Sequence, residues 1–213
     1  MRYACIFRKI KDLPAMEMEI EEPTTQIQNV VSSVVLGQRL DLDEIAATMP
    51  NVEFDPEQFP GLVYRLKKHK TATLIFNTGK MVCTGAKSAK ESKRAVHKIV
   101  KYLKEAGIEI TGKPVITVQN IVASGNLHVA LNLEKASLTL ENSLYEPEQF
   151  PGLIHRMREP KTVILLFGSG KIVITGAKTE EQVPAAAIKI SNRLQELDLM
   201  MHPLDDDEDE YED

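Results

Sequence analysis

The sequence repeats itself after 91 residues, and this duplication limits the fold more than any other feature. Between residues 28–87 and 119–178, without a gap, 28 of the 60 paired positions hold the same residue. The longest shared stretch, Pro56–Leu62, returns unchanged as Pro147–Leu153. Agreement of this length and register excludes chance, and it is typical of two copies of one structural unit.

The duplication also predicts the division of the chain. We expect residues 23–110 to form a first repeat and residues 111–200 a second one. Residues 1–22 lie outside the repeat as an N-terminal extension without an assignment. Residues 201–213 form an acidic tail, in which eight of the nine residues of Asp205–Asp213 are acidic. A segment of this composition repels itself, so we expect the tail to be disordered.

Charge and composition narrow the class of protein. The formal net charge is −5, but the two ends account for it, since 22 basic and 18 acidic residues remain between positions 23 and 204. No run of apolar residues approaches the roughly 20 that a membrane helix needs. Cys5 and Cys83 are too few for a disulfide framework and fit a reducing compartment. We therefore expect an intracellular protein with a positively charged central part.

Each repeat predicts the same order of elements. Strand patterns lie near 28–36, 62–67, 71–76 and 80–84, with a short helix at 41–49 and a longer helix from residue 88. Asp41 is a candidate cap for the short helix, and Asn77–Gly79 is a hairpin signal. Ser88–Glu91 and Thr179–Gln182 both match the capping box. Pro184 stands late for the first turn, so the last helix is expected to begin a few residues further on.

Identity between the repeats alternates along the strands. Val82 and Thr84 are identical to their counterparts, whereas Met81 and Cys83 are both replaced by Ile. Because successive side chains of a strand point to opposite faces, one face is fixed by identity and the other only needs to be apolar. Each repeat has only enough helix to cover one face. The fixed face is therefore either a dimer or domain interface, or a binding surface for a partner with two-fold symmetry.

The duplicated motifs resemble a known family. The stretches QNVV and QNIV, PEQFPGL followed by Arg, LIF and LLF, and GKMVCTGAK and GKIVITGAK are similar to the core of the TATA-binding proteins. The resemblance covers about residues 26–199. It implies an α+β fold, in which two tandem pseudo-symmetric repeats form one ten-stranded antiparallel curved sheet, a saddle with helices on its convex face. The acidic tail and the lack of a long low-complexity N-terminal region resemble archaeal members.

The family implies a function. Its members are general transcription factors that bind the minor groove of the A·T-rich TATA box in promoters and kink the DNA. They nucleate the preinitiation complex with transcription factor B and, indirectly, RNA polymerase. The resemblance thus implies promoter DNA as the partner, no cofactor or metal, no enzymatic activity, and a cytoplasmic, nucleoid-associated protein, or a nuclear one if the source is eukaryotic. A weak homodimer could form in the absence of DNA.

The resemblance also assigns residues. The phenylalanines that intercalate between base pairs are implied to be Phe59, Phe76, Phe150 and Phe167. Transcription factor B is implied to dock near Glu146 and Glu148.

The fixed face itself predicts DNA contacts, because its apolar side chains suit A·T edges and would reject the amino group of G·C pairs in the minor groove. The expected groove-floor residues, with Asn and Thr as the few donors, are Asn29, Val31, Leu74, Val82, Thr84, Asn120, Val122, Leu165, Val173 and Thr175. Six cations recur at the same offset and are expected to hold phosphate groups. They are Arg65, Lys80, Lys87, Arg156, Lys171 and Lys178.

Other functions find less support in the sequence. Gly168–Lys171 lacks the spacing of a phosphate-binding loop and is followed by a strand, so it predicts a hairpin. The five histidines show no metal-ligand spacing. An enzyme with a TATA-binding-like accessory domain would need a catalytic domain, for which few residues remain. A protein-interaction module that binds a helix or a DNA mimic would not need the four phenylalanines and six cations.

Overall fold

The computed structural model of the chain describes residues 21–67 and 70–201. The expectations for the N-terminal extension before residue 21 and for the acidic tail concern residues that lie outside the described part of the chain. None of the described helices is both long and apolar enough to cross a membrane.

Ten strands form one antiparallel sheet in the order β2-β3-β4-β5-β1-β6-β11-β10-β9-β8. The strands are β1 (Thr24–Val35), β2 (Val52–Glu53), β3 (Leu62–Leu66), β4 (Thr71–Ile75), β5 (Lys80–Ala86), β6 (Val115–Asn126), β8 (Ser143–Leu144), β9 (Leu153–Met157), β10 (Thr162–Leu166) and β11 (Lys171–Ala177). The order reads the same from both edges towards the central pair β1 and β6, as two equivalent repeats require. The predicted ten-stranded antiparallel sheet is confirmed. Two further strands, β7 (Ala130–Leu131) and β12 (Met200–Met201), form a separate pair.

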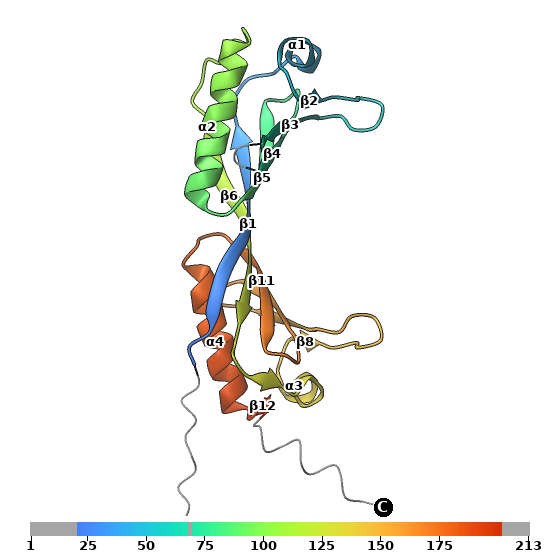
Figure 1. Cartoon of the computed structure of the whole chain (residues 1–213), viewed down its shortest axis with the longest axis vertical. Helices are drawn as coiled ribbons and strands as arrows, with labels where there is room; N and C mark the ends of the chain where they lie inside the picture. Colours follow the sequence, from blue (N-terminus) through green and yellow to red (C-terminus); the bar gives the residue numbers. More distant parts are fainter. Residues whose placement is uncertain (1–20, 68–69, 202–213) are drawn as a thin grey trace, which may run out of the picture.

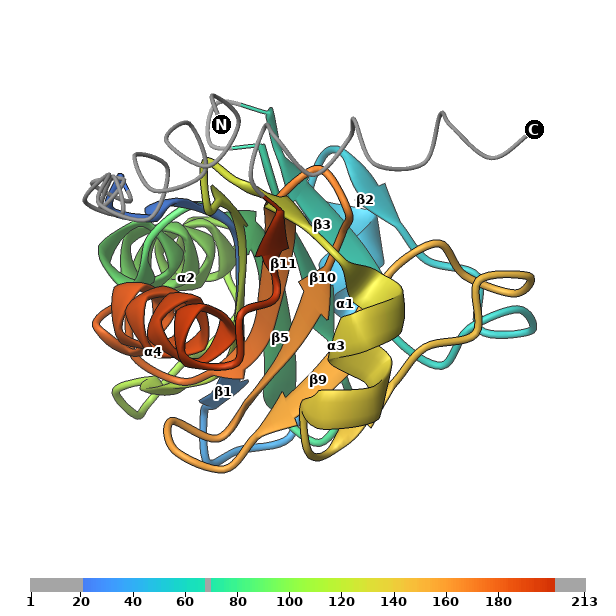
Figure 2. The same ribbon diagram turned by 90° about the horizontal axis from the view of Figure 1, so that it is seen from below.

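The two long helices lie on one face of this sheet, and the two short helices lie at its ends. Each repeat contributes a short and a long helix: α1 (Leu42–Thr48) and α2 (Ala89–Glu105), then α3 (Leu133–Thr139) and α4 (Gln182–Glu196). Figure 1 shows α2 and α4 on the same face, while the β2–β3 and β8–β9 loops project from the two ends in the opposite direction. Figure 2, viewed from below, shows α2 and α4 on the same side of the sheet, one in each half of the molecule. The molecule is therefore a saddle with its long helices on the convex face.

Local capping explains three of the four helix starts. Asp41 and Ser88 are N-caps, as predicted, and their side chains accept hydrogen bonds from the backbone nitrogens three residues later at 3.0 Å each. Asn132 caps α3 in the same way. The capping box predicted at Thr179 forms only in part. Oε1 of Gln182 accepts from the backbone nitrogen of Thr179 at 3.4 Å, but α4 begins at Gln182, and Glu181, which precedes it, makes no side-chain capping bond. Pro184 then falls in the first turn, where its missing N–H costs no helical hydrogen bond.

Burial follows the predicted alternation of faces. In β5, Met81 and Cys83 are buried under α2, whereas Val82 and Thr84 are half-buried on the other face. The face fixed by identity is thus the face without helices. The core consists of one cluster in each half, and Val30 and Ala86 of the first repeat belong to the cluster of the second. Shared core residues of this kind join the halves into one unit.

The central strands carry the irregularities that bend the sheet. The β1–β6 register shifts between Ile27 and Asn29, and again between Val31 and Ser32. An extra residue on one strand bends that strand and increases its local twist. The two shifts lie symmetrically about the middle of the sheet, so they favour a curved sheet whose uncovered face is concave.

Candidate nucleic-acid interface

The groove-floor residues predicted from the sequence all lie half-buried on the concave face. Cross-strand pairing brings them into contiguous rows: Leu74 pairs with Val82, and Leu165 pairs with Val173. At the centre of the sheet, Asn29 pairs with Val122 and Val31 pairs with Asn120. The ten residues are Asn29, Val31, Leu74, Val82, Thr84, Asn120, Val122, Leu165, Val173 and Thr175. The structure therefore joins them into one apolar strip with polar groups at its middle.

The two central asparagines are held in one orientation. Oδ1 of Asn120 accepts a hydrogen bond from the backbone nitrogen of Gly176 at 2.7 Å. Its Nδ2 donates to Oγ1 of Thr175 at 3.2 Å. An amide NH₂ carries two hydrogens, and no described residue accepts the second. The acceptor end of the amide is thus satisfied by the protein, and a donor remains for a ligand.

The first repeat has the same arrangement. Oδ1 of Asn29 accepts from the backbone nitrogen of Gly85 at 2.7 Å, and Nδ2 donates to Oγ1 of Thr84 at 3.2 Å. The sequence placed Asn and Thr on one face. The backbone N–H that fixes the amide comes from a residue 56 positions away, so sequence reasoning could not identify it.

The four predicted phenylalanines come together as two pairs, one at each end of the saddle. The ring centroids of Phe59 and Phe76 are 5.9 Å apart, with an angle of 64° between the rings. Phe150 and Phe167 show the same distance and an angle of 66°. Rings that meet edge to face in this way attract one another. Phe59 remains 37% exposed, although an apolar ring of this size is more often found in a core.

A glycine lies directly behind each aromatic pair. A Cβ atom on Gly61 would lie 2.7 Å from Cε1 of Phe59 and 2.9 Å from Cε1 of Phe76. Gly152 stands in the same relation to the second pair. The sequence analysis missed these glycines as part of the site. The available signal was their recurrence two residues after a phenylalanine in both repeats.

The six predicted phosphate-binding cations are all exposed, and they differ in their partners. Lys80 and Lys171 begin β5 and β11, and Lys87 and Lys178 follow the ends of these strands. Arg65 donates through Nε to Oε1 of Glu53 at 3.1 Å. The second repeat has Leu144 in place of this glutamate. Among the described residues, Arg156 has no carboxylate within ion-pair distance.

The two glutamates predicted to bind a partner lie in the β8–β9 loop, and both are exposed. The backbone oxygen of Glu146 accepts hydrogen bonds from the backbone nitrogens of Gln149 at 3.0 Å and Phe150 at 2.9 Å. This turn fixes the loop and positions Phe150. The side chains of Glu146 and Glu148 remain free to face solvent.

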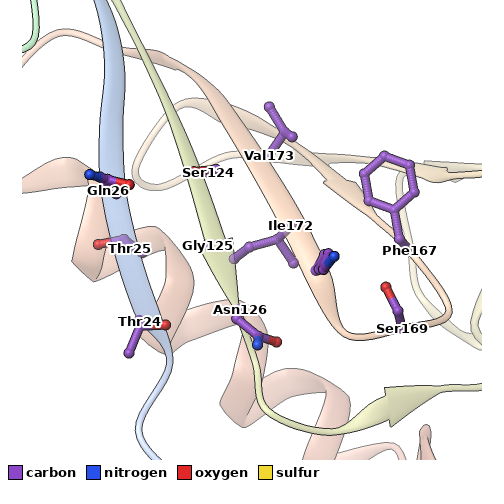
Figure 3. Close-up of a pocket in the computed structure, with 11 residues that line it drawn as sticks. Thr24, Thr25, Gln26, Ser124, Gly125, Asn126, Phe167, Ser169, Ile172 and Val173 are labelled. Atoms are coloured by element: carbon purple, nitrogen blue, oxygen red, sulfur yellow. The ribbon is translucent and has the colours of Figure 1, made fainter.

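A cavity of about 710 Å³ opens on the concave face beside the second aromatic pair. Phe167, Ser169 and Lys171 line it from β11 and its hairpin, and the start of β1 and the end of β6 line it from the other side (Figure 3). A smaller cavity of about 440 Å³ lies at the equivalent place in the first half, lined by Phe76 and Lys80.

The chain is similar to proteins of known name. Residues 24–106 and 115–197 each match the family described as "Transcription factor TFIID (or TATA-binding protein, TBP)". The "TATA-box-binding protein" of Sulfolobus acidocaldarius is 56% identical over 185 residues, which cover 87% of this chain and 93% of the relative. That of Pyrodictium occultum is 58% identical over 176 residues, covering 83% and 88%.

The fold agrees with these similarities. The solved structure of "Methanococcus jannaschii TBP" superposes with a TM-score of 0.75 at 50% identity and covers 81% of this chain and 98% of that one. The relatives are archaeal, as the resemblance in the sequence implied. The family match covers both repeats in tandem, and the sheet has the strand order that two such repeats produce. The chain belongs to the TATA-binding protein family.

Proposed function

We propose that this chain is a general transcription factor that binds the minor groove of an A·T-rich promoter box and kinks the DNA with its two phenylalanine pairs. The single observation that carries this proposal is the recurrence of one aromatic pair, with the same 5.9 Å spacing, at both ends of an apolar concave sheet. Apolar side chains inserted between base pairs unstack them and bend the duplex. The chain is proposed to act by binding alone, without an enzymatic step.

The chemistry of the strip between the aromatic pairs supports an A·T-rich ligand. The minor groove of A·T pairs presents only hydrogen-bond acceptors, whereas G·C pairs add an amino group that protrudes into the groove. Valine and leucine side chains cannot accept a hydrogen bond from that amino group. Asn29 and Asn120 present amide donors, since their oxygens are engaged by backbone nitrogens. Donors flanked by apolar side chains match acceptors at the middle of an A·T-rich site.

The exposed cations support contacts to the DNA backbone. Lys80 and Lys171 stand at equivalent ends of the strip, and the other cations repeat at the same offset. Lysine and arginine neutralise phosphates and fix the register of a protein on the duplex, without reading the sequence. We therefore assign the sequence preference to the strip and most of the salt-dependent affinity to the cations.

The wedge assignment is tested by DNA bending. Phe150→Ala together with Phe167→Ala is expected to lengthen the end-to-end distance of a bound A·T-rich duplex, measured by energy transfer, because one base step loses its wedge. Leu138→Ala, at an 87% exposed residue of α3, serves as the control and leaves bending unchanged. Normal bending by the double variant would contradict the wedge assignment.

We further propose that the β8–β9 loop recruits transcription factor B, and through it RNA polymerase. The support is the pair of exposed carboxylates of Glu146 and Glu148. The turn of the loop uses the backbone of Glu146, so the two side chains are available to a partner. Glu146→Arg together with Glu148→Arg is expected to leave DNA binding intact and to abolish the ternary complex in a gel shift. Glu57→Arg in the first loop is the matched control for Glu148. Equal loss of DNA binding and of the ternary complex would instead place these residues in the DNA surface or the fold.

The concave face also explains how the free protein could associate with itself. Without DNA, the same apolar strip is open to solvent, and a second copy could cover it. We propose a weak homodimer that competes with DNA. Sedimentation velocity, with and without an A·T-rich duplex, tests this. A protein that stays monomeric at high concentration without DNA would exclude it.

A further inference from the structure

The two ends of the central strand pair carry different side chains on the concave face. At one end, Lys80 of β5 pairs with Val35 of β1, which pairs with Val115 of β6. We call these three residues the first end row. At the equivalent place in the other half, β11, β6 and β1 supply the second end row, which consists of Lys171, Asn126 and Thr24.

The first end row is apolar apart from its lysine. Val35 and Val115 are 43% and 64% exposed. They are therefore among the few large apolar side chains that the described part of the chain leaves in solvent. Neither side chain can donate a hydrogen bond. A DNA backbone at this end would meet one ammonium group and two surfaces suited to the apolar faces of the sugars.

The second end row is polar and internally organised. Oδ1 of Asn126 accepts a hydrogen bond from the backbone nitrogen of His128 at 3.0 Å. The oxygen of the amide is thereby engaged, so its NH₂ group is the end left for a ligand. Oγ1 of Thr24 lies 3.0 Å from Nε2 of His128, whose Nδ1 lies 3.7 Å from the carboxylate of Glu21. Gly37 occupies the position of His128 in the first repeat, so the contacts of the imidazole ring with Thr24 and Glu21 have no counterpart there.

The second end row opens into the larger of the two cavities on the concave face. Figure 3 shows Thr24 on β1 and Asn126 on the neighbouring strand, with Ser169 at the turn that precedes β11. Together with Lys171, these side chains supply an ammonium group, an amide and two hydroxyls around one cavity. Hydroxyl, amide and ammonium donors are the groups that proteins use to hold phosphate oxygens.

The arginines differ between the halves in the same direction. Arg65 already pairs with Glu53 at 3.1 Å, whereas Arg156 has no such partner among the described residues. An arginine that shares its charge with a carboxylate offers less attraction to a phosphate. Two independent differences, at the end rows and at the arginines, thus favour a stronger grip by the second half.

We propose that Asn126 and Thr24, beside Lys171, hold a DNA phosphate group that the first half does not hold, and that this unequal grip makes the sheet bind an asymmetric A·T-rich box in a preferred direction. This inference rests on the DNA binding proposed above. A two-fold symmetric face has equal affinity in both directions, so only differences between its halves can select one. The two end rows differ in this way, and they lie on the concave face beside the aromatic pairs.

Exchange of the end rows tests the proposal. The apolar variant carries Thr24→Val and Asn126→Val, the polar variant carries Val35→Asn and Val115→Thr, and the exchange variant carries all four substitutions. Each variant copies the residues of the other half, so side-chain size and strand propensity are balanced across the set. Urea unfolding confirms that each variant folds.

Direction is read by cleavage of the DNA. A chemical nuclease is attached to a cysteine introduced by Gln149→Cys. Cys5 is replaced by Ser so that it does not react, and Cys83 is buried and therefore not accessible to the reagent. The duplex carries one asymmetric A·T-rich box, and the ratio of cleavage at its two ends reports the two directions. We expect the wild-type protein to favour one end. The apolar and polar variants should each lower this preference by about tenfold or more, since one hydrogen bond to a charged phosphate is lost or gained.

The exchange variant decides the outcome. It is expected to move the ratio towards the opposite end, and phosphate ethylation interference is expected to move one contact from the second half to the first. An exchange variant that keeps the wild-type ratio and the wild-type interference pattern overturns the inference, as does a wild-type protein that shows no preference. A wild-type protein that does not bind the A·T-rich duplex would refute the proposed function itself.

Discussion

A methyl group on Gly152 would lie 2.7 Å from Cε1 of Phe150, which is closer than two non-bonded carbon atoms approach. The backbone of Gly152 does not adopt a left-handed conformation, so the glycine is required for space. It lets the rings of Phe150 and Phe167 pack directly above the chain. The aromatic pair and the glycine therefore form one unit.

Gly152→Ala is expected to displace the second aromatic pair. The added methyl group overpacks a buried position, which typically costs about 1–3 kcal/mol of stability. We expect reduced bending of an A·T-rich duplex, measured by energy transfer, at a temperature where the variant is fully folded. Gly168→Ala is the matched control, because its methyl group meets only the backbone oxygen of Leu131, at 3.8 Å. Equal bending by both variants would show that ring position does not depend on this glycine.

Asn120→Asp separates the two roles of the central amide. Aspartate keeps an oxygen that can accept from the backbone nitrogen of Gly176, so the strand geometry is expected to persist. It loses the NH₂ donor and places a negative charge opposite the acceptors of the groove floor. A base-edge contact is worth about 1–3 kcal/mol, so affinity for A·T-rich DNA should fall about tenfold or more. An unchanged affinity, measured at the same salt concentration, would remove Asn120 from the DNA surface.

His155 predicts a pH dependence of stability on the acid side. Burial in β9 of the second repeat lowers the pKa of His155 below its usual 6.5, and a hydrogen bond with the backbone of Glu141 opposes this only in part. The unfolded chain therefore binds a proton more readily than the folded one. Protonation of His155 should therefore leave the free energy of unfolding unchanged above about pH 6.5 and should lower it as the pH falls below that value.

The measurement compares urea unfolding at pH 8 and pH 5.5 for the wild type and for His155→Gln. Glutamine remains neutral at both values, so the difference between the two proteins isolates the contribution of the histidine from that of the carboxylates. The loss of stability at pH 5.5 should be smaller for the variant. An identical loss in both proteins would mean that His155 is not protonated differently in the folded and unfolded states.

The duplication made most of the fold predictable. Alternating identity identified the concave face, because residues such as Val82 and Met81 are constrained in different ways by the two faces. The short strands β2 and β8 were not predicted, since two residues carry no periodic pattern. The first strand was predicted to begin four residues too late, because Thr24–Ile27 differs from its counterpart Val115–Val118 at every position, and the identity between the repeats begins only at Gln28.

The site was predictable as far as it is symmetric. The phenylalanines, the asparagines and the lysines recur at one offset, so the repeat itself marked them. The contacts between Asn29 and Gly85, or between Arg65 and Glu53, depend on long-range pairing that no local pattern contains. Differences between the halves were also missed, because a search for identity passes over positions such as Val35 and Asn126. Those positions distinguish one half from the other.

The two arginines give a matched test of the backbone contacts. Six phosphate contacts predict that log K falls with log salt at a slope near −5, from about −0.9 per contact. Arg156→Ala is expected to make this slope shallower by about one unit. Arg156 has no carboxylate partner among the described residues, so the variant loses one complete phosphate contact. Arg65→Ala should change the slope less, since Glu53 already neutralises part of that charge and must be displaced before a phosphate can bind.

Removal of the carboxylate completes the test. Glu53→Leu copies Leu144 of the second repeat and frees Arg65, so the slope should become steeper than that of the wild type. In the Glu53→Leu background, Arg65→Ala should then change the slope of log K against log salt by about as much as Arg156→Ala does, so that the two halves respond equally. The measurement is binding to an A·T-rich duplex over a series of salt concentrations. If Glu53→Leu left both the slope and the effect of Arg65→Ala unchanged, the ion pair would not weaken the grip of the first half, and the asymmetry would have to come from the end rows alone.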